Sequence, residues 1–539
     1  MARTHIVVPM TVAALVALAA APVGAEQRDG FVTQQAAMLA GATPGVTVRP
    51  LLTVGETLPN GYRFEAIPDG IALDKRNGHR VDVYVNHETS LVPFPYVPAA
   101  PTINNSLNDF HNAQVSKLTL STRTGGVLDG TFAIPSSANY QRFCSNFLAT
   151  KEQGFNRRIL FTNEEATDIV YRTGTAWPVA PAPGANGSDP EQAGVVVAYD
   201  VKAGTYRSIY GMGRFNHENA VPVPGYRGVA ILSGDDTFSA PSSQMYLYTA
   251  RDARAVLDDE GALWAFVSDD PTVNDYGDLT GSRTVSGRFI AVPRAVAVGD
   301  QTGLENWSNA NNVFQFIRIE DIAYDRTDPH VVYFADTGEP RARAWQAGDP
   351  AALETRLVRG AAGTTGPYPN GRIFRMVLDD EDPTQVTSLE ILIDADAGGY
   401  NNPGVIHQPD NLETTVDSLL IQEDPGSHNQ YALSNSAGVG ARVWKYDLSS
   451  GDLDAVIEVD QSLDEEPGYD VDPSAAANRG AWESSGIIDA SSIWGPGWFL
   501  IDVQAGSLIL QREDGTLGDR AVTFEREGGQ LLRVKIPGT

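Results

Sequence analysis

The sequence predicts an all-β protein, a six-bladed β-propeller, and two kinds of repeat carry this prediction. Six β-prone runs with polar or acidic ends recur at irregular intervals of about 70 to 100 residues, the length of a propeller blade with variable loops. A second short motif lies upstream of each run, outer-type strands lie downstream, and almost no amphipathic helix separates them. Units of strand, strand, strand and turn repeated in this way are typical of propellers.

The chain begins with a pattern typical of a cleaved signal peptide over residues 1–25. A weakly basic start precedes the apolar, Ala-rich stretch from Ile6 to Ala21, and Val23-Gly24-Ala25 offers the small residues that a signal peptidase accepts. The apolar stretch is too short for a permanent anchor, and no other segment approaches a membrane span. We therefore expect a secreted or periplasmic monomer in which residues 26–539 form a single propeller domain, with inserted loops and an insertion at about 251–317.

The composition limits the classes of partner. The net charge of −29 and the pI near 4.6 argue against nucleic acid and against an anionic membrane surface as partners. One interpretation of this charge is that it only keeps an exported protein soluble. The other is that clustered carboxylates bind calcium outside the cell. Cys144 is the single cysteine, so the domain has no internal disulfide and must be held together by packing or by bound ions. A lone cysteine is most often a small buried hydrophobic residue.

The six β-prone runs are rich in branched or aromatic side chains, and each ends at a turn. They are VDVYVNHETS (81–90), RILFTNEEATD (158–168), GVAILSGDDT (228–237), HVVYFADTGE (330–339), SLLIQEDPG (418–426) and WFLIDVQAG (498–506). Several of them end in two adjacent acids, of which Glu164-Glu165 and Asp235-Asp236 are the clearest pairs.

The upstream motifs carry a chemically similar residue at one matching position. The motifs are PDGIALD, FCSNFLAT, FNHENAVPV, RIEDIAYD, QPDNLETT and WESSGIIDA. Five of the six have an acid there and the remaining one has Cys144; the acids are Asp69, Glu218, Glu320, Asp410 and Glu483.

Equivalent positions in a propeller form rings at one mouth of the central channel, because the innermost strands lie side by side around it. A ring of carboxylates would repel itself strongly unless cations lay between its members. A single acid of this kind is more often a turn cap, but recurrence in register, with one cysteine, favours a metal site. His87 and His217 each lie in an NHE triplet at a strand end, where a histidine is more often a hydrogen-bonding partner than a ligand.

The motifs VNHE, TNEE, RFNHEN, SGDD, RIED, QPDN and WESSG, in this order, resemble those of the PhoX-type alkaline phosphatases and the wider bacterial family around them. The similarity extends from about Asp69 to the C-terminus and is clearest between Cys144 and Gly426. GALWAFVSDD and the stretch up to Arg318 resemble the insertion between two blades of that family. The resemblance implies an exported six-bladed propeller that hydrolyses small phosphate monoesters with calcium and iron at the channel mouth.

Transferred to this chain, the resemblance implies two groups of site residues. The implied metal ligands are Cys144, Glu164, Glu165, Glu218, Asp235, Asp236, Glu320 and Asp410. The implied catalytic residues are Arg318, whose guanidinium can make a two-pronged contact with a phosphoryl group, and Glu320. The chain departs from the family in the segment after Cys144, in Thr162-Asn163 before the paired glutamates, in the lone Arg3 of the leader and in RIED in place of RPE.

Two other functions remain compatible with the residues. One is a hydrolase of the same fold that acts like a phytase or on phosphodiesters. The other is a non-catalytic calcium-binding propeller. Cys144 separates these hypotheses, because a purely calcium-binding module has no use for a thiol where the other repeats have an acid. Cys144→Ser should abolish activity in an iron-dependent phosphatase and change little in a calcium-binding module.

Overall fold

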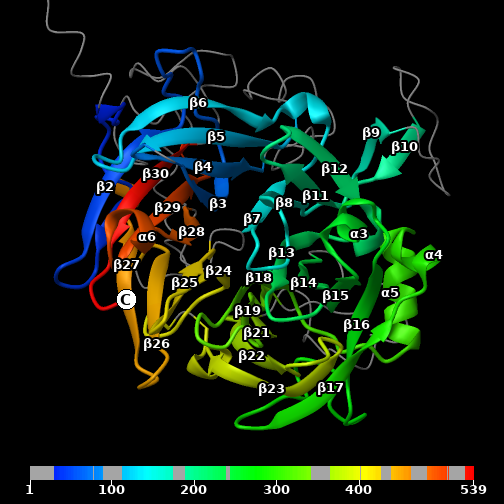
Figure 1. The fold of residues 1–539 in the computed structure, drawn as a ribbon. Coiled ribbons are helices and arrows are strands. Elements are labelled where there is room, and N and C mark those ends of the chain that lie inside the picture. Colours follow the sequence, from blue (N-terminus) through cyan, green and yellow to red (C-terminus); the bar gives the residue numbers. More distant parts are fainter. Residues whose placement is uncertain are drawn as a thin grey trace, which may run out of the picture.

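The computed structural model consists almost entirely of antiparallel β-sheets arranged around a central axis (Figure 1). It describes residues 29–76, 78–88, 112–173, 189–237, 243–341, 365–400, 402–425, 439–462, 482–506, 508 and 528–539. The predicted signal peptide at 1–25 lies outside these residues. The prediction of an all-β, propeller-like fold is confirmed.

Four sheets of four or five strands and one sheet of nine strands make up the body. The first sheet contains β3 (Pro68–Lys75), β4 (Arg80–His87), β5 (Gln114–Ser121) and β6 (Val127–Ile134). The second contains β7 (Phe143–Ala149), β8 (Ile159–Glu164), β11 (Val196–Asp200) and β12 (Thr205–Ile209). The nine-stranded sheet contains, in spatial order, β13 (His217–Val223), β14 (Val229–Asp235), β15 (Met245–Ala250), β16 (Ala262–Ser268), β17 (Thr284–Ala291), β23 (Gln385–Asp394), β22 (Arg372–Leu378), β19 (Val331–Asp336) and β18 (Ile319–Tyr324).

The two remaining large sheets are completed by strands from the beginning of the chain. One contains β24 (Pro409–Thr414), β25 (Ser418–Glu423), β26 (Arg442–Asp447), β27 (Leu453–Val459) and β1 (Leu39–Gly41). The last sheet contains β28 (Glu483–Asp489), β29 (Trp498–Ala505), β30 (Gly528–Lys535) and β2 (Thr47–Thr53). The antiparallel pairing of β2 with β30 joins the two ends of the chain in one sheet, where Figure 1 shows blue beside red.

The innermost strands form a closed circle. β3 contacts β7, β7 contacts β13, β13 contacts β18, β18 contacts β24, β24 contacts β28, and β28 contacts β3. Apolar side chains fill the spaces between neighbouring sheets: Tyr84 of β4 packs with Leu160 of β8, and Leu420 of β25 packs with Ile501 of β29. This packing fixes the circle of strands, and with it any residue at equivalent positions on them.

The predicted insertion at about 251–317 supplies α3 (Ala253–Leu257), β16, β17, α4 (Arg294–Ala297) and α5 (Gln301–Ala310). β16 continues the sheet outward from β15, whereas β17 pairs with both β16 and β23 and so joins two sets of strands edge to edge. Smaller elements are β9 (Ile169–Thr173), β10 (Asp189–Gln192), β20 (Glu339–Arg341), β21 (Thr365–Tyr368), α6 (Ser491–Trp494) and the 3-10 turns η1 (Ser136–Ala138), η2 (Tyr210–Met212) and η4 (Asp396–Gly398).

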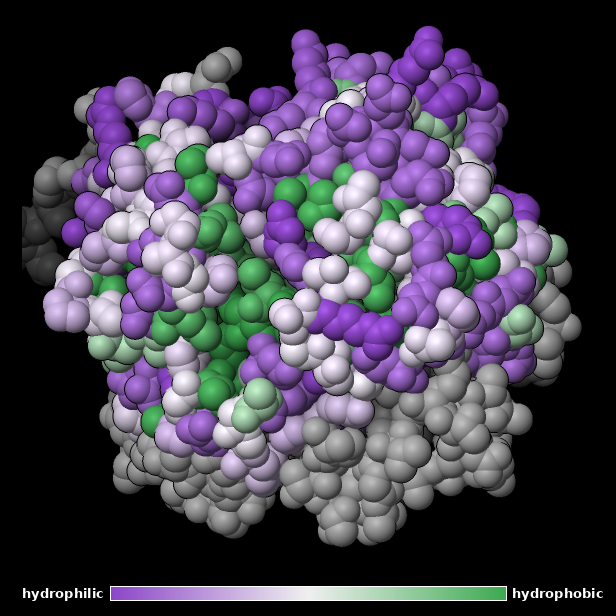
Figure 2. Space-filling model, turned by 90° about the horizontal axis from the view of Figure 1, so that it is seen from below, coloured by the Kyte–Doolittle hydropathy of each residue, from purple (hydrophilic) through white to green (hydrophobic). Residues whose placement is uncertain are grey.

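The surface seen in Figure 2 is mostly hydrophilic, with a narrower band of hydrophobic residues between hydrophilic ones. None of the helices in the described part of the chain has the length and apolar character needed to cross a membrane.

Candidate metal centre

A β-bulge occurs at the same place in five of the innermost strands. In each strand two residues lie opposite a single residue of the neighbouring strand. The bulged pairs are Asp69-Gly70, Cys144-Ser145, Glu218-Asn219, Glu320-Asp321 and Asp410-Asn411. Bulges re-aim side chains, and here the first residue of each pair is the acid or cysteine that the sequence singled out.

The two adjacent acids at the ends of the second strands have different surroundings. Glu164 turns back into the fold, where its carboxylate accepts hydrogen bonds from the backbone N–H groups of Gln141 (2.8 Å), Gly194 (3.1 Å) and Val195 (3.2 Å). Asp235 accepts a hydrogen bond from the Thr237 hydroxyl at 2.6 Å. Neither belongs to a group of potential metal ligands in the described part of the chain. The structure therefore does not bring these two predicted ligands to the ring.

The second acid of each pair does reach the ring. Ten side chains form five overlapping groups of three, and within each group the potential ligand atoms lie within 4.8 Å of one another. The groups are Asp69–Glu88–Cys144, Cys144–Glu165–Glu218, Glu165–Asp236–Glu320, Glu218–Glu320–Asp410 and Asp410–Asp424–Glu483. Successive groups share a residue, so these ten residues, which we call the carboxylate ring, form one continuous set of donors.

The carboxylate ring is an unfavourable environment for ionised carboxylates when no cation is bound. Burial, followed by the charges of neighbouring acids, raises the pKa values of Glu165, Glu218 and Glu320 well above the ordinary range. Buried oxygens of Asp69 (Oδ1), Glu218 (Oε2) and Asp410 (Oδ1) have no hydrogen-bond partner among the described residues. Buried carboxylate oxygens without donors are costly unless they are protonated or bind a cation. The donor set therefore fits bound metal ions.

Cys144 lies within this set. Its thiol donates a hydrogen bond to Asp69 Oδ2 at 2.9 Å and lies 3.7 Å from Glu88 Oε1. Burial raises the pKa of the Cys144 thiol, and the charges of Asp69 and Glu218 raise it further. A thiolate can form there only beside a cation, which deprotonates a thiol that it binds. Cys144 is buried, as expected of a lone cysteine, but it is not merely a hydrophobic residue.

Among the described residues, the basic side chain of Arg318 contacts the ring. Its Nε and Nη2 atoms donate to the two oxygens of Asp236 at 2.6 and 2.5 Å, and Nη2 lies 3.3 Å from Glu320. Its backbone is held by Asp336, whose carboxylate accepts hydrogen bonds from the N–H groups of Ile317 (2.8 Å) and Arg318 (3.2 Å). The Arg318 guanidinium therefore contacts two carboxylates of the ring, and hydrogen bonds to Asp336 hold the Arg318 backbone in place.

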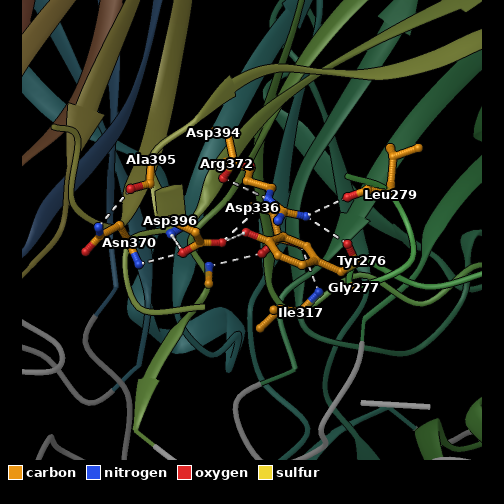
Figure 3. Close-up of polar contacts among 12 residues, drawn as sticks. Tyr276, Gly277, Leu279, Ile317, Asp336, Asn370, Arg372, Asp394, Ala395 and Asp396 are labelled. Carbon is orange, nitrogen blue, oxygen red and sulfur yellow. Dashed lines mark hydrogen bonds and ion pairs between the residues drawn. The ribbon is translucent and has the colours of Figure 1, made fainter. Parts of the chain in front are cut away.

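A polar network beside Asp336 ties the insertion to the sheet that carries Arg318 (Figure 3). Arg372 of β22 donates to the carbonyls of Tyr276 (2.8 Å) and Leu279 (3.1 Å), and its guanidinium lies 4.1 Å from the centre of the Tyr276 ring. The Tyr276 hydroxyl donates to Asp396 at 2.5 Å, and Asp396 also accepts from the N–H of Asn370 at 2.9 Å. Residues 276–279, within the predicted insertion, are therefore anchored to β22 and η4.

A hydrogen bond spans the circle of innermost strands next to the carboxylate ring. The Asn411 side chain of β24 donates to the hydroxyl of Ser145 on β7 at 3.1 Å, and these two strands lie opposite each other in the circle. Ser145 in turn donates to Glu218 at 2.8 Å. These two consecutive hydrogen bonds orient the Glu218 carboxylate.

The structure brings six of the eight predicted ligands to the ring and places Arg318 against them; Glu164 and Asp235 are the two exceptions. Asp69 and Glu483, which the sequence predicted for a ring of acids, are present in it. Glu88 and Asp424 were missed, although each follows its second strand at the position that Glu165 occupies after β8.

The histidines are structural, as predicted. His87 contacts Ala66 O and Ser116 Oγ, and His217 contacts Ser233 Oγ and Gly213 O. Burial lowers the pKa of His87 to about 4 and that of His217 to about 3, so both side chains are neutral at physiological pH.

No protein-family model and no curated protein matches the sequence. Among solved structures, the chain is similar to Pseudomonas fluorescens PhoX in complex with vanadate, a transition state analogue, with a TM-score of 0.59 and 16% identity over 94% of this chain and 98% of that one. The chain has the fold of PhoX. A second match, a putative dipeptidyl aminopeptidase IV from Bacteroides ovatus, has a TM-score of 0.24 and 8% identity over 89% of this chain and 62% of that one.

Proposed function

We propose that this protein is an exported, metal-dependent hydrolase of small phosphate monoesters, with its active site at the carboxylate ring. The observation that carries the proposal is the ring itself: ten potential ligands, one of them a thiol, lie beside Arg318. The fold supports the proposal, since the similar PhoX structure contains vanadate as a transition state analogue. The leader pattern at 1–25 supports export.

The donor types suggest which ions are held. The groups made only of carboxylates, such as Glu165–Asp236–Glu320, suit calcium, which prefers oxygen ligands. Cys144 offers a thiolate to a transition metal, and iron is our proposal for it. When bound, such cations would neutralise charge on a phosphoryl group and make an attacking water more acidic.

Arg318 is the proposed contact to the phosphoryl group. Its two-pronged pairing with Asp236 is the geometry with which a guanidinium also binds two phosphoryl oxygens. When Asp236 binds a cation, the Arg318 guanidinium would exchange this pairing for a contact with the phosphoryl oxygens of the substrate. Glu320 keeps the guanidinium oriented from its other side, and burial of the site limits competition from water.

We count six blades in this propeller. The circle of six innermost strands supports this number if the nine-stranded sheet is taken as two blades joined through β17. The insertion then separates these two blades. We further propose that residues 26–539 act as a monomer.

The proposal is tested by metal analysis of the purified protein together with hydrolysis of p-nitrophenyl phosphate and bis-p-nitrophenyl phosphate, each with and without calcium. Iron and calcium in the protein, with calcium-dependent hydrolysis of the monoester, are expected. Preferred hydrolysis of the diester would replace the monoesterase with a phosphodiesterase. Calcium without any hydrolysis would contradict the enzymatic function and leave a calcium-binding propeller.

A further inference from the structure

In each blade-like set of strands, one residue of the second strand lies opposite the bulge of the innermost strand. At three of these positions the residue carries a side-chain amide that bonds to a neighbouring sheet. Asn86 donates to the carbonyl of Cys144 at 2.5 Å, Asn163 donates to that of Glu218 at 3.4 Å, and Gln422 donates to that of Ser485 at 3.0 Å. In each case the acceptor belongs to the innermost strand of the next sheet, so the amide joins two sheets.

In the last sheet this position is Asp502, which lies opposite the bulge at Ser485 and Gly486. Asp502 is fully buried, and neither of its carboxylate oxygens has a hydrogen-bond partner among the described residues. The other positions of this kind, Gly234 and Ala335, carry no polar group. Asp502 therefore presents an acceptor where three of its five counterparts present a donor.

Asp69, which lies beside Asp502 on the innermost strand of the first sheet, also presents hydrogen-bond acceptors. A Cβ atom on Gly486 would stand 2.5 Å from the backbone oxygen of Asp69 and 2.8 Å from Asp502 Oδ1, so both oxygens face the same small space. Asp69 Oδ1 is likewise buried without a hydrogen-bond partner among the residues described. The backbone oxygen of Asp69 and Asp502 Oδ1 thus lie close together at the junction between the last sheet and the first, and no ion pair to Asp502 is found in the described residues to balance its charge.

We propose that a hard cation of the calcium type binds at this junction, held by the carboxylate of Asp502 and the backbone carbonyl of Asp69. An unpaired buried carboxylate is strongly disfavoured, and a cation with several oxygen ligands removes both this cost and the repulsion between facing acceptors. The ion links the first and last sheets, as the three amides link other neighbouring sheets. This role is structural and goes beyond the proposed hydrolytic function.

The test compares calcium content and thermal unfolding of wild type with those of Asp502→Asn. The substitution introduces the amide that three of the equivalent positions carry, so the chain is expected to fold without the ion. One calcium per chain fewer than in wild type is expected, together with a smaller rise of Tm on adding calcium. Asp454→Asn on the exposed part of β27 is the matched control and should behave as wild type.

The inference is overturned if Asp502→Asn binds as much calcium as wild type. Loss of iron together with calcium would also overturn it, because Asp502 would then serve the carboxylate ring. If the variant does not fold, long-wavelength anomalous diffraction from calcium-soaked wild-type crystals decides: a peak at about 2.3–2.6 Å from Asp502 supports the site and its absence rejects it. Since none of these measurements uses hydrolysis, a failure of the proposed function leaves the inference standing.

Discussion

Glu164 and Glu165 are neighbours in sequence, but they serve different purposes because successive residues of a strand face opposite ways. Glu164 satisfies three backbone N–H groups inside the fold, whereas Glu165 belongs to two of the potential metal-binding groups. The same division separates Asp235, which accepts from Thr237, from Asp236, which pairs with Arg318. At the scale of single residues, internal hydrogen bonding and potential metal ligation are therefore assigned to different members of each acidic pair.

Glu164→Ala and Glu165→Gln should separate these two roles. Glu164→Ala leaves buried N–H groups without acceptors, and at about 1–3 kcal/mol for each such group it should lower the free energy of unfolding clearly. Its metal content per folded chain should stay that of wild type. Glu165→Gln should lose metal and keep the unfolding midpoint of metal-free wild type. Denaturant titration and metal analysis measure both; the reverse pattern would contradict the assignment.

Arg318→Lys should lower kcat/KM by about 10²-fold or more, because a lysine cannot reproduce the two-pronged contact. Metal content should be unchanged, since Arg318 is not a ligand. Arg326→Lys is a suitable control: Arg326 pairs with Glu413 away from the carboxylate ring, and its replacement should leave kcat/KM as it is. Equal losses in both variants would show that Arg318 acts only through stability.

At the scale of strands and sheets, features that depend on local sequence were predictable, whereas features that depend on pairing between distant segments were not. The β-prone runs and the acids of the innermost strands were predictable because β-propensity and repetition are local properties. The bulges and the pairing of β17 with β23 were not, because they depend on contacts between distant segments. Without the register of β8 and β14, the sequence could not tell which acid of each pair reaches the channel.

The network in Figure 3 should make the anchoring of the insertion depend on pH. Burial raises the pKa of Asp396 from 3.8 to about 6. The unfolded chain therefore loses this proton first, so the contribution of Asp396 to stability is complete below pH 3.8 and is lost as pH rises through about 6. Relative to Asp396→Asn, wild type should lose up to about 3 kcal/mol of unfolding free energy over this window. Urea titrations of both proteins from pH 4 to pH 7 measure the difference, and parallel pH profiles would contradict it.

At the scale of the whole molecule, the circle of innermost strands brings buried carboxylates close together, where their mutual repulsion and the loss of hydration are largest. The chain has a net charge of −29, and ten potential ligands, nine of them carboxylates, lie at one level of the circle. Strand pairing between β2 and β30 closes the propeller at its edge, but it does not relieve this repulsion at the centre. Cations held by the carboxylate ring would do so, and would thereby stabilise the arrangement of all the sheets.

Removal of divalent and trivalent ions should therefore destabilise the entire domain. An ion that binds only the folded state contributes about 2.7 kcal/mol at a concentration one hundred times its Kd, and several sites add their contributions. Dialysis against a chelator should lower Tm by several degrees, and calcium should restore most of the loss. Sodium chloride at the same ionic strength should restore little, because screening acts weakly on buried charges. An unchanged Tm after verified metal removal would mean that the ring carboxylates are neutral in the folded protein and need no ions.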